Sequence, residues 1–511
     1  MTRQQITFVF LILAMTTSEV FAQTKPTNKP PPYTANAPAS ILTPDMVHTE
    51  HLGDLKFFDG MPLKDTVDKA YDFLDLSRGM EAFLNGIPAA SVYAVLEGFK
   101  AAGLNPGDVG IFEHLMDARS LFLTPNSTTM YCVAEVNVKG GPVVVEVPPG
   151  VLGPLDDAFF RFVTDIGNTG PDQGQGGKYL FVHRDYKGGI PCDNFFVAKT
   201  PTYRNLFFFR AFVEKGKSLD EVATAVKSKL RIYPLAQAAK PPEQVFVDLS
   251  GKQFNTVHSN DFDFYKELDA VIQYEPADAF DPELVGQFAA IGIKKGQPFN
   301  PDERMKKILT EAVAIGNATA RAITFVPRKQ SVYFYTDRKW TPIYAGMSYE
   351  FMNKGERVLD DRILFHYYAT GITPAMVAPE PGTGSVYAFT ARDVNGDYLD
   401  GGKTYKVTLP GPIPVNNFWS FMVYSGQHRS MLETDQQTAG LDSNNTSVMP
   451  DDQSGKGSYT IWFGPTAPPD HQGNWIQTIP KKSYNVMLRL YGPLQPWFDK
   501  TWKPGDVELV E

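Results

Sequence analysis

"FFRFVTDIGNTGPDQGQGGKYLFV", residues 159–182, places two short strand-like runs on either side of a glycine-rich connection. In the first run, period-two alternation puts Arg161 and Asp165 on one face, opposite Phe160 and Phe162. The connection between the runs holds five glycines and one proline, which are the residues that punctuate strands with turns. This stretch therefore predicts a β-structure of short strands with polar side chains on otherwise apolar strands.

Runs of the same kind fill residues 121–213 and return from residue 385, as in "GPVVVEVPPG", "NLFFFRAFV", "SVYAFTARD", "NNFWSFMVYS" and "YNVMLRLYG". Helical spacing of apolar residues marks residues 63–102 and the stretch after residue 281. We therefore predict a mainly β fold with helical segments (α+β), in which two β-sandwich or jelly-roll-like domains are joined by helices. The predicted parts are an N-terminal β-rich domain with leading helices (41–235), a mostly helical connection (236–384) and a C-terminal jelly-roll-like domain (385–511).

The first 22 residues are typical of an export signal. One positive charge in "MTRQQ" precedes the apolar segment "ITFVFLILAM", and "VFA" ends in the small residue expected before cleavage. We expect cleavage near Ala22, a solvated spacer over residues 23–40, and a periplasmic or secreted protein. No other stretch is predicted to span a membrane.

The net charge and the glycine-rich connection argue against nucleic acid as a partner and against a nucleotide cofactor. A formal net charge of −9 leaves no basic field for nucleic acid. The glycine-rich connection is not a nucleotide cradle, because Lys178 is followed by Tyr179 and a strand rather than by Ser or Thr at the start of a helix. We therefore expect no nucleotide cofactor. We expect instead that the glycines let the backbone of this connection pass close to a ligand or to another chain.

Arg161 and Asp165 on an apolar strand leave two interpretations open. In the first, they form a structural ion pair at a sheet edge. In the second, they form the floor of a polar pocket, to which the loop adds Asp172. In the second case Asp165 and Asp172 act as acid and base, or bind a divalent metal.

Cys132 lies in a strand-like run and Cys192 in a loop. Outside the cell the two thiols can pair, so a disulfide between them stays open beside two unpaired thiols.

Near the C-terminus, Arg489 and Tyr491 share one face of a core-like strand, and Asn474–Trp475 lies in a loop-like segment. A tryptophan in a loop suits ligand stacking as well as core packing.

The long motifs resemble a known pair of domains. "LTPNSTTMYCVAEVNVKGGPVVVEVPPGVLG" and "FRFVTDIGNTGPDQGQGGKYLFV" resemble domain of unknown function 1254, and "YLDGGKTYKVTLPGPIPVNNFWSFMVYSGQHRSMLETDQQ" with "NWIQTIPKKSYNVMLRLYGPLQPWFDKTWKPGDVE" resembles domain of unknown function 1214. The resemblance implies an exported, often oligomeric bacterial protein with two β-rich domains, and it supplies no reaction. The positions that match the family are Asn126, Tyr131, Arg161, Asp165, Asp172, Tyr179, Asn474, Trp475, Arg489 and Tyr491, whereas Cys132 and Cys192 are not part of its pattern.

Two functions follow as hypotheses. The first is an exported hydrolase or lyase for a glycan or another polar small molecule, with Asp165 and Asp172 as catalytic groups and Arg161, Tyr131 and Tyr179 around the ligand. The second is a non-catalytic ligand-binding or envelope protein, in which Trp475 and Arg489 matter more than the aspartates. Carboxylates that converge in a deep pocket favour the first hypothesis, and a pocket elsewhere favours the second.

Overall fold

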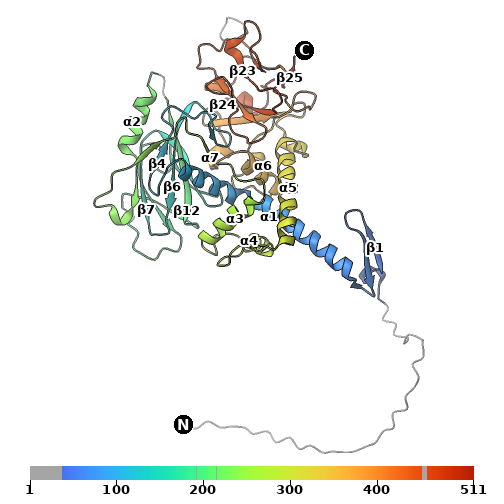
Figure 1. Ribbon diagram of the computed structural model, residues 1–511. Coiled ribbons are helices and arrows are strands. Elements are labelled where there is room, and N and C mark those ends of the chain that lie inside the picture. Colours follow the sequence, from blue (N-terminus) through green and yellow to red (C-terminus); the bar gives the residue numbers. More distant parts are fainter. Residues whose placement is uncertain (1–36, 192, 214–215, 452–456, 511) are drawn as a thin grey trace, which may run out of the picture. The chain divides into compact units, whose positions relative to one another are not determined.

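The computed structural model describes residues 37–191, 193–213, 216–451 and 457–510, and it confirms a mainly β fold with helical segments (Figure 1). The chain forms two compact units, which meet in sequence between Ala70 and Tyr71. In the first unit, strands β1 (Met46–Thr49), β2 (Gly53–Phe58) and β3 (Met61–Pro62) form a three-stranded antiparallel sheet. The predicted signal and most of the predicted spacer lie outside the described residues, so export stays a prediction.

The N-terminal half of the second unit contains a sandwich of two sheets. The six-stranded sheet has the order β14-β4-β6-β12-β8-β9 and the four-stranded sheet the order β11-β10-β7-β13. The larger sheet consists of β4 (Val109–Ile111), β6 (Thr129–Asn137), β8 (Val151–Asp157), β9 (Phe162–Gly167), β12 (Arg204–Phe212) and β14 (Phe246–Asp248). The smaller sheet consists of β7 (Val143–Val147), β10 (Gly177–His183), β11 (Phe196–Thr200) and β13 (Arg231–Pro234).

One apolar core lies between these two sheets. Cys132 and Phe209 from the larger sheet belong to the same buried cluster as Val145 and Phe181 from the smaller one. Helix α2 (Leu219–Lys229) adds Val222, Ala223 and Val226 to this cluster, and its first turn is held by a capping box between Ser218 and Glu221. A short parallel pair, β5 (Ser120–Leu121) with β15 (Phe254–Asn255), completes this part.

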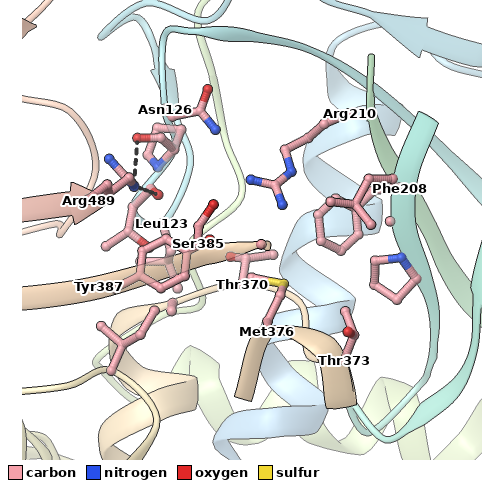
Figure 2. A pocket seen from close by; sticks show the side chains of 18 of the residues that line it. Leu123, Asn126, Phe208, Arg210, Thr370, Thr373, Met376, Ser385, Tyr387 and Arg489 are labelled. Carbon is pink, nitrogen blue, oxygen red and sulfur yellow. Dashed lines mark hydrogen bonds between the residues drawn. The ribbon is translucent and has the colours of Figure 1, made fainter. Parts of the chain in front are cut away.

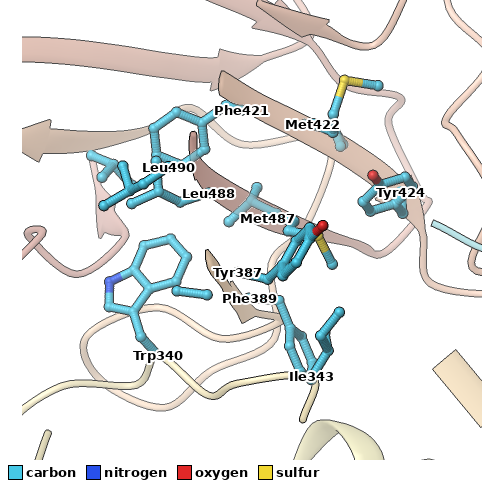
Figure 3. Close-up of a cluster of buried hydrophobic side chains, with 14 of the residues drawn as sticks. Trp340, Ile343, Tyr387, Phe389, Phe421, Met422, Tyr424, Met487, Leu488 and Leu490 are labelled. Atoms are coloured by element: carbon cyan, nitrogen blue, oxygen red, sulfur yellow. The ribbon is translucent and has the colours of Figure 1, made fainter. Parts of the chain in front are cut away.

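A second sandwich occupies the C-terminal part of the chain. One sheet has the order β18-β24-β20-β21 and the other the order β23-β22-β19-β25. Their strands are β18 (Ser385–Thr390), β19 (Tyr405–Leu409), β20 (Val415–Ser425), β21 (Gly440–Asp442), β22 (Tyr459–Gly464), β23 (Trp475–Gln477), β24 (Tyr484–Pro493) and β25 (Glu508–Leu509). Figure 3 shows part of its core, where Trp340 packs beside Phe421, Leu488 and Leu490.

Helices supply a third core. The later turns of α1 (Lys64–Ala101) pack with α3 (Asp263–Tyr274), α4 (Pro282–Ala290), α5 (Glu303–Phe325) and α6 (Leu359–Tyr368) around Phe83, Phe264 and Leu309. The shorter elements of this unit are β16 (Met352–Asn353), β17 (Glu356–Arg357), α7 (Pro374–Val377) and, near the end of the chain, α8 (Gln495–Phe498). One-turn 3-10 helices lie at Ala39–Ile41, Leu235–Gln237, Gln330–Val332, Ala345–Met347 and Gln472–Asn474.

Helix α1 is long and apolar enough to cross a membrane by length and composition, which the sequence analysis did not expect. Of its apolar window, 89% is buried inside the protein. That burial, together with its place in the helical core, accounts for its apolar composition.

Two helical glycines bring α1 and α5 into close contact. A Cβ atom on Gly79 would lie 2.7 Å from the Cβ of Ala312, and a Cβ on Gly316 would lie 2.7 Å from the ring of Phe83. Gly286 in α4 has no atom within 4 Å of such a position.

We expect Gly79→Ala and Gly316→Ala each to lower the free energy of unfolding by about 1–3 kcal/mol, because the added methyl group overpacks the contact between the helices. Gly286→Ala is the matched control, and it should be neutral or add about 0.5–1 kcal/mol through helix propensity. Urea denaturation measures all three variants. Equal effects at the three positions would show that the helices do not approach closely at the glycines.

Candidate functional site

A cavity of about 80 Å³ lies between the two sandwiches. Strands β6, β8 and β12 line it from the first sandwich, and β18 and β24 line it from the second. The loop before β6 and the segment after α6 close the remaining sides. Figure 2 shows Arg210 projecting into this cavity, with Asn126 and Arg489 on one side and Thr373 and Met376 on another.

The register of the strands brings an arginine and a tyrosine together on each side of the cavity. Arg210 in β12 lies directly opposite Tyr131 in β6, and Arg489 in β24 lies directly opposite Tyr387 in β18. Directly opposite residues share a face of the sheet, so each pair presents its guanidinium and its phenol to the same side. All four residues line the cavity.

Arg489 is 3% exposed and is held by neutral oxygens. Its Nη2 donates to the carbonyl of Thr124 at 2.9 Å and to the hydroxyl of Tyr424 at 2.6 Å. The hydroxyl of Tyr424 in turn donates to the carbonyl of Pro125 at 2.7 Å. The Nη1 of Arg489 is buried without a partner, so the guanidinium keeps donors to spare.

Neither cavity arginine is neutralised by an acid. Within the described part of the chain, no aspartate or glutamate lines the cavity. Burial lowers the pKa of both guanidinium groups, but tyrosines around them raise it further, so both pKa values end above their usual range. A buried cation, Arg489, and a half-buried one, Arg210, in one small cavity favour an anion as its occupant.

Asn126 and Tyr131 shape the wall next to Arg489. The Nδ2 of Asn126 donates to the Tyr131 hydroxyl at 2.8 Å, and its Oδ1 accepts from the N–H of Thr129 at 3.0 Å. Burial raises the pKa of Tyr131. The tyrosine therefore stays protonated and neutral beside the arginines.

Asp165 lies behind the cavity wall. It is 7% exposed, and its Oδ1 is buried without a partner. Burial raises its pKa to about 6, while hydrogen bonds from the side chains of Thr373 and Thr169 lower it. Both threonines line the cavity, whereas Asp165 itself does not.

Asp172 holds the glycine-rich loop together. Its Oδ1 accepts from the N–H of Gly167 at 2.8 Å and from the Tyr179 hydroxyl at 2.5 Å, and its Oδ2 accepts from the N–H of Gly176 at 3.0 Å. Neither Asp172 nor Tyr179 lines the cavity, and Tyr179 packs in the core of the first sandwich. Of the loop itself, Thr169 reaches the cavity wall.

Arg161 does not form the predicted ion pair with Asp165. Because Phe160 has a φ of 52°, the chain turns there and β9 begins only at Phe162, so Arg161 stands outside the alternation. The Nε of Arg161 donates to Asp157 at 2.6 Å instead. Arg161 lines a different pocket, described below.

The remaining predicted ligand contacts near the C-terminus lie away from the cavity. Asn474 joins two segments, accepting from the N–H of Met449 at 2.8 Å and donating to the carbonyl of Thr460 at 3.1 Å. The indole N–H of Trp475 donates to the carbonyl of Gly464 at 2.9 Å. Tyr491 stacks on Phe418 with ring centroids 4.0 Å apart, and its hydroxyl is buried without a hydrogen-bond partner.

The disulfide and the metal site both remain predictions. Cys132 is a buried free thiol in β6, and burial raises its pKa. Cys192 lies outside the described residues, so no pairing can be assigned to it. Among the described residues, no group of three or more His, Cys, Asp or Glu side chains is placed to hold a metal ion.

Sequence reasoning missed Arg210, Tyr387 and Ser385, all of which line the cavity. Arg210 interrupts the apolar run "NLFFFRAFV" in the way that Arg161 interrupts its own run. That signal was available. What the sequence lacked was the pairing of β12 with β6, which carries Arg210 to Tyr131.

Comparison with known proteins confirms the two domains. The family described as a protein of unknown function (DUF1254) matches residues 107–234, and the family described as a protein of unknown function (DUF1214) matches residues 384–495. No curated protein matches the chain.

Two solved structures are similar. The VPA0106 protein from Vibrio parahaemolyticus has a TM-score of 0.52 at 15% identity, over 86% of this chain and 100% of that one. A putative uncharacterized protein from Burkholderia cenocepacia has a TM-score of 0.38 at 12% identity, over 86% and 96% of the two chains. At this identity the first match shows the fold alone.

We expect Asp172→Ala to lower the free energy of unfolding by about 2–5 kcal/mol, because it leaves two N–H groups and one hydroxyl without their acceptor. Tyr179→Phe removes one of these bonds and should cost about 1 kcal/mol. Chemical denaturation measures both variants. A loss of ligand affinity in Asp172→Ala at unchanged stability would contradict this structural role.

Asp165 makes stability depend on pH. Its pKa is about 6 in the folded protein against 3.8 as a free side chain, so the folded state binds the proton more tightly. This contribution is fully present below pH 3.8 and falls by about 3 kcal/mol as the pH rises from there through 6. Asp165→Asn should flatten that part of the curve, measured as the free energy of unfolding at pH 4.5, 5.5 and 7. The exposed control Asp220→Asn should keep the slope of the wild type, and an unchanged slope in Asp165→Asn would refute the assignment.

Proposed function

We propose that this chain, which joins a DUF1254 domain to a DUF1214 domain, binds a small organic monocarboxylate between its two sandwiches. The observation that carries the proposal is the pair Arg210 and Arg489, a half-buried and a buried cation that line one cavity into which no described acid projects. A carboxylate accepts charge-assisted hydrogen bonds from guanidinium groups, and such bonds contribute about 1.5–3 kcal/mol each.

The rest of the cavity supports a short, partly apolar ligand. Leu123, Phe208 and Met376 provide an apolar wall, and Ser385 and Thr370 add hydroxyl groups. A volume of about 80 Å³ suits a few heavy atoms rather than a sugar chain, which favours a small molecule over a glycan. The proposed site corresponds to the binding hypothesis, in which Arg489 carries more weight than the aspartates.

Propionate is the probe, and propionamide is its neutral isostere. We expect propionate to bind the wild type and propionamide to bind at least tenfold more weakly, measured by isothermal titration calorimetry. Arg210→Met and Arg489→Met should each weaken propionate binding by about 10- to 100-fold, because each removes about 1.5–3 kcal/mol of charge-assisted hydrogen bonding.

Arg392→Met is the matched control. Arg392 is also half-buried, and its Nη2 donates to the Tyr333 hydroxyl at 2.5 Å, but it does not line the cavity. Its replacement should leave propionate affinity unchanged. Equal binding of the acid and the amide, or an equal loss in all three arginine variants, would refute the proposal.

A hydrolase or lyase acting on the same class of molecule is the second candidate. The raised pKa of Asp165 favours it, because a carboxyl group with a pKa of about 6 can give and take a proton near neutral pH. Thr169 and Thr373 stand between this carboxyl and the cavity. Turnover of small esters or hydroxy acids that disappears in Asp165→Asn, with propionate affinity retained, would favour the enzyme. The predicted homo-oligomer stays a prediction.

A further inference from the structure

A second pocket, of about 370 Å³, lies among the helices of the same unit. Its walls are aromatic and come from segments far apart in the sequence. The rings belong to Phe159, Phe160, Phe162, Phe280, Tyr349 and Phe351. Helix α6 contributes Arg362 and His366, and α1 contributes Asn85.

Two polar residues one helical turn apart line this pocket. Arg362 and His366 stand at positions i and i+4 of α6 and therefore share a helix face. Arg362 is 9% exposed and His366 is 2% exposed. The Nε of Arg362 and the Nδ1 of His366 are both buried without a hydrogen-bond partner. Buried nitrogens of this kind are costly unless a ligand completes them.

Arg362 is not paired with an acid. Its Nη2 donates to the Oδ1 of Asn85 at 2.6 Å, and the groups that shift its pKa are burial and the neighbouring Arg357, both of which lower it, to about 10. By contrast, Arg161 in the same pocket already pairs with Asp157, and Nη1 of Arg357 donates to the carbonyl of Glu350. The carboxylates of Asp281, Glu283 and Glu350 lie at exposed positions of the pocket, where water screens them. The fourth acid of the pocket, Glu81, is half-buried and accepts from the Nδ2 of Asn85 at 2.9 Å.

Two phenylalanines with left-handed backbone conformations pack against the ring of His366. Phe160 has a φ of 52° and stacks on the His366 ring at 5.5 Å, and Phe351 has a φ of 56° and meets the ring edge-on at 5.3 Å. Bulky residues rarely adopt this left-handed backbone, and such strain gathers at sites that bind ligands. Burial lowers the pKa of His366 well below its ordinary value, so the ring is neutral and one of its nitrogens can donate.

From this geometry we infer that the helical pocket is a second binding site, for an aromatic carboxylate. The ring of the ligand packs against the phenylalanine walls, and its carboxylate accepts hydrogen bonds from the guanidinium group of Arg362 and from the N–H of the neutral His366 ring. The inference is independent of the cavity between the sandwiches, because the two sites share no lining residue.

Benzoate is the probe, and benzamide is the neutral ring of the same shape. We expect benzoate to bind the full chain, and Arg362→Met to weaken benzoate at least tenfold while benzamide changes by less than threefold. Arg392→Met, at a residue that lines neither pocket, is the control and should leave benzoate affinity unchanged. Isothermal titration calorimetry measures all of these affinities.

Leu284→Trp keeps the proposal open to refutation if Arg362→Met does not fold. Leu284 is half-buried, lines the pocket from α4, and takes no part in the polar contacts of Arg362. The larger side chain should fill the pocket and weaken benzoate and benzamide together at least tenfold. The inference is overturned if wild type shows no benzoate binding, if both pocket variants bind benzoate as wild type does, or if Arg392→Met alone abolishes binding.

Discussion

The contact between Arg489 and the loop before β6 fixes how the second sandwich meets the first. Among the described residues no acid pairs with the buried guanidinium, so it depends on the carbonyl of Thr124 and the hydroxyl of Tyr424 for its hydrogen bonds. Tyr424 reaches the same loop at Pro125. The next residue, Asn126, orients Tyr131 on the cavity wall. One buried charge therefore positions the loop that closes the cavity.

Helix α6 connects the two candidate sites. It presents Arg362 and His366 to the helical pocket, and the chain that leaves its C-terminal end lines the cavity between the sandwiches. That chain is held by two buried carboxyl groups of the first sandwich: Asp156 accepts from the N–H of Ile372 at 2.9 Å, and the side chain of Thr373 hydrogen-bonds to Asp165. These polar groups lie at the edges of apolar cores, where hydrogen bonds must replace the contacts with water.

Local signals predicted the elements better than their partners. At the start of α4, Asp281 caps the first turn and Pro282 follows it, which is a residue pair typical of a helix start. At the start of α5, a similar pair, Asn300–Pro301, lies just outside the helix, and Asp302 is the cap. Strand alternation failed at Arg161, because a single left-handed residue, Phe160, shifts the register of the side chains. Such a backbone conformation is stabilised by its surroundings and leaves no signal in a bulky residue.

By itself, the sequence determined the mainly β class, the two β-rich parts, the helices between them and the resemblance to two domain families, because periodicity and turn residues are local properties. It also pointed to Asn126, Tyr131 and Arg489 as ligand-binding residues, and all three line the cavity. Only the tertiary structure decided that Arg210 and Arg489, 279 positions apart (489 − 210), share one cavity. It likewise placed the Asp172 carboxyl within its own loop. Cross-strand register and the packing of one sandwich on another bring distant residues together, and no pattern along the chain encodes those distances.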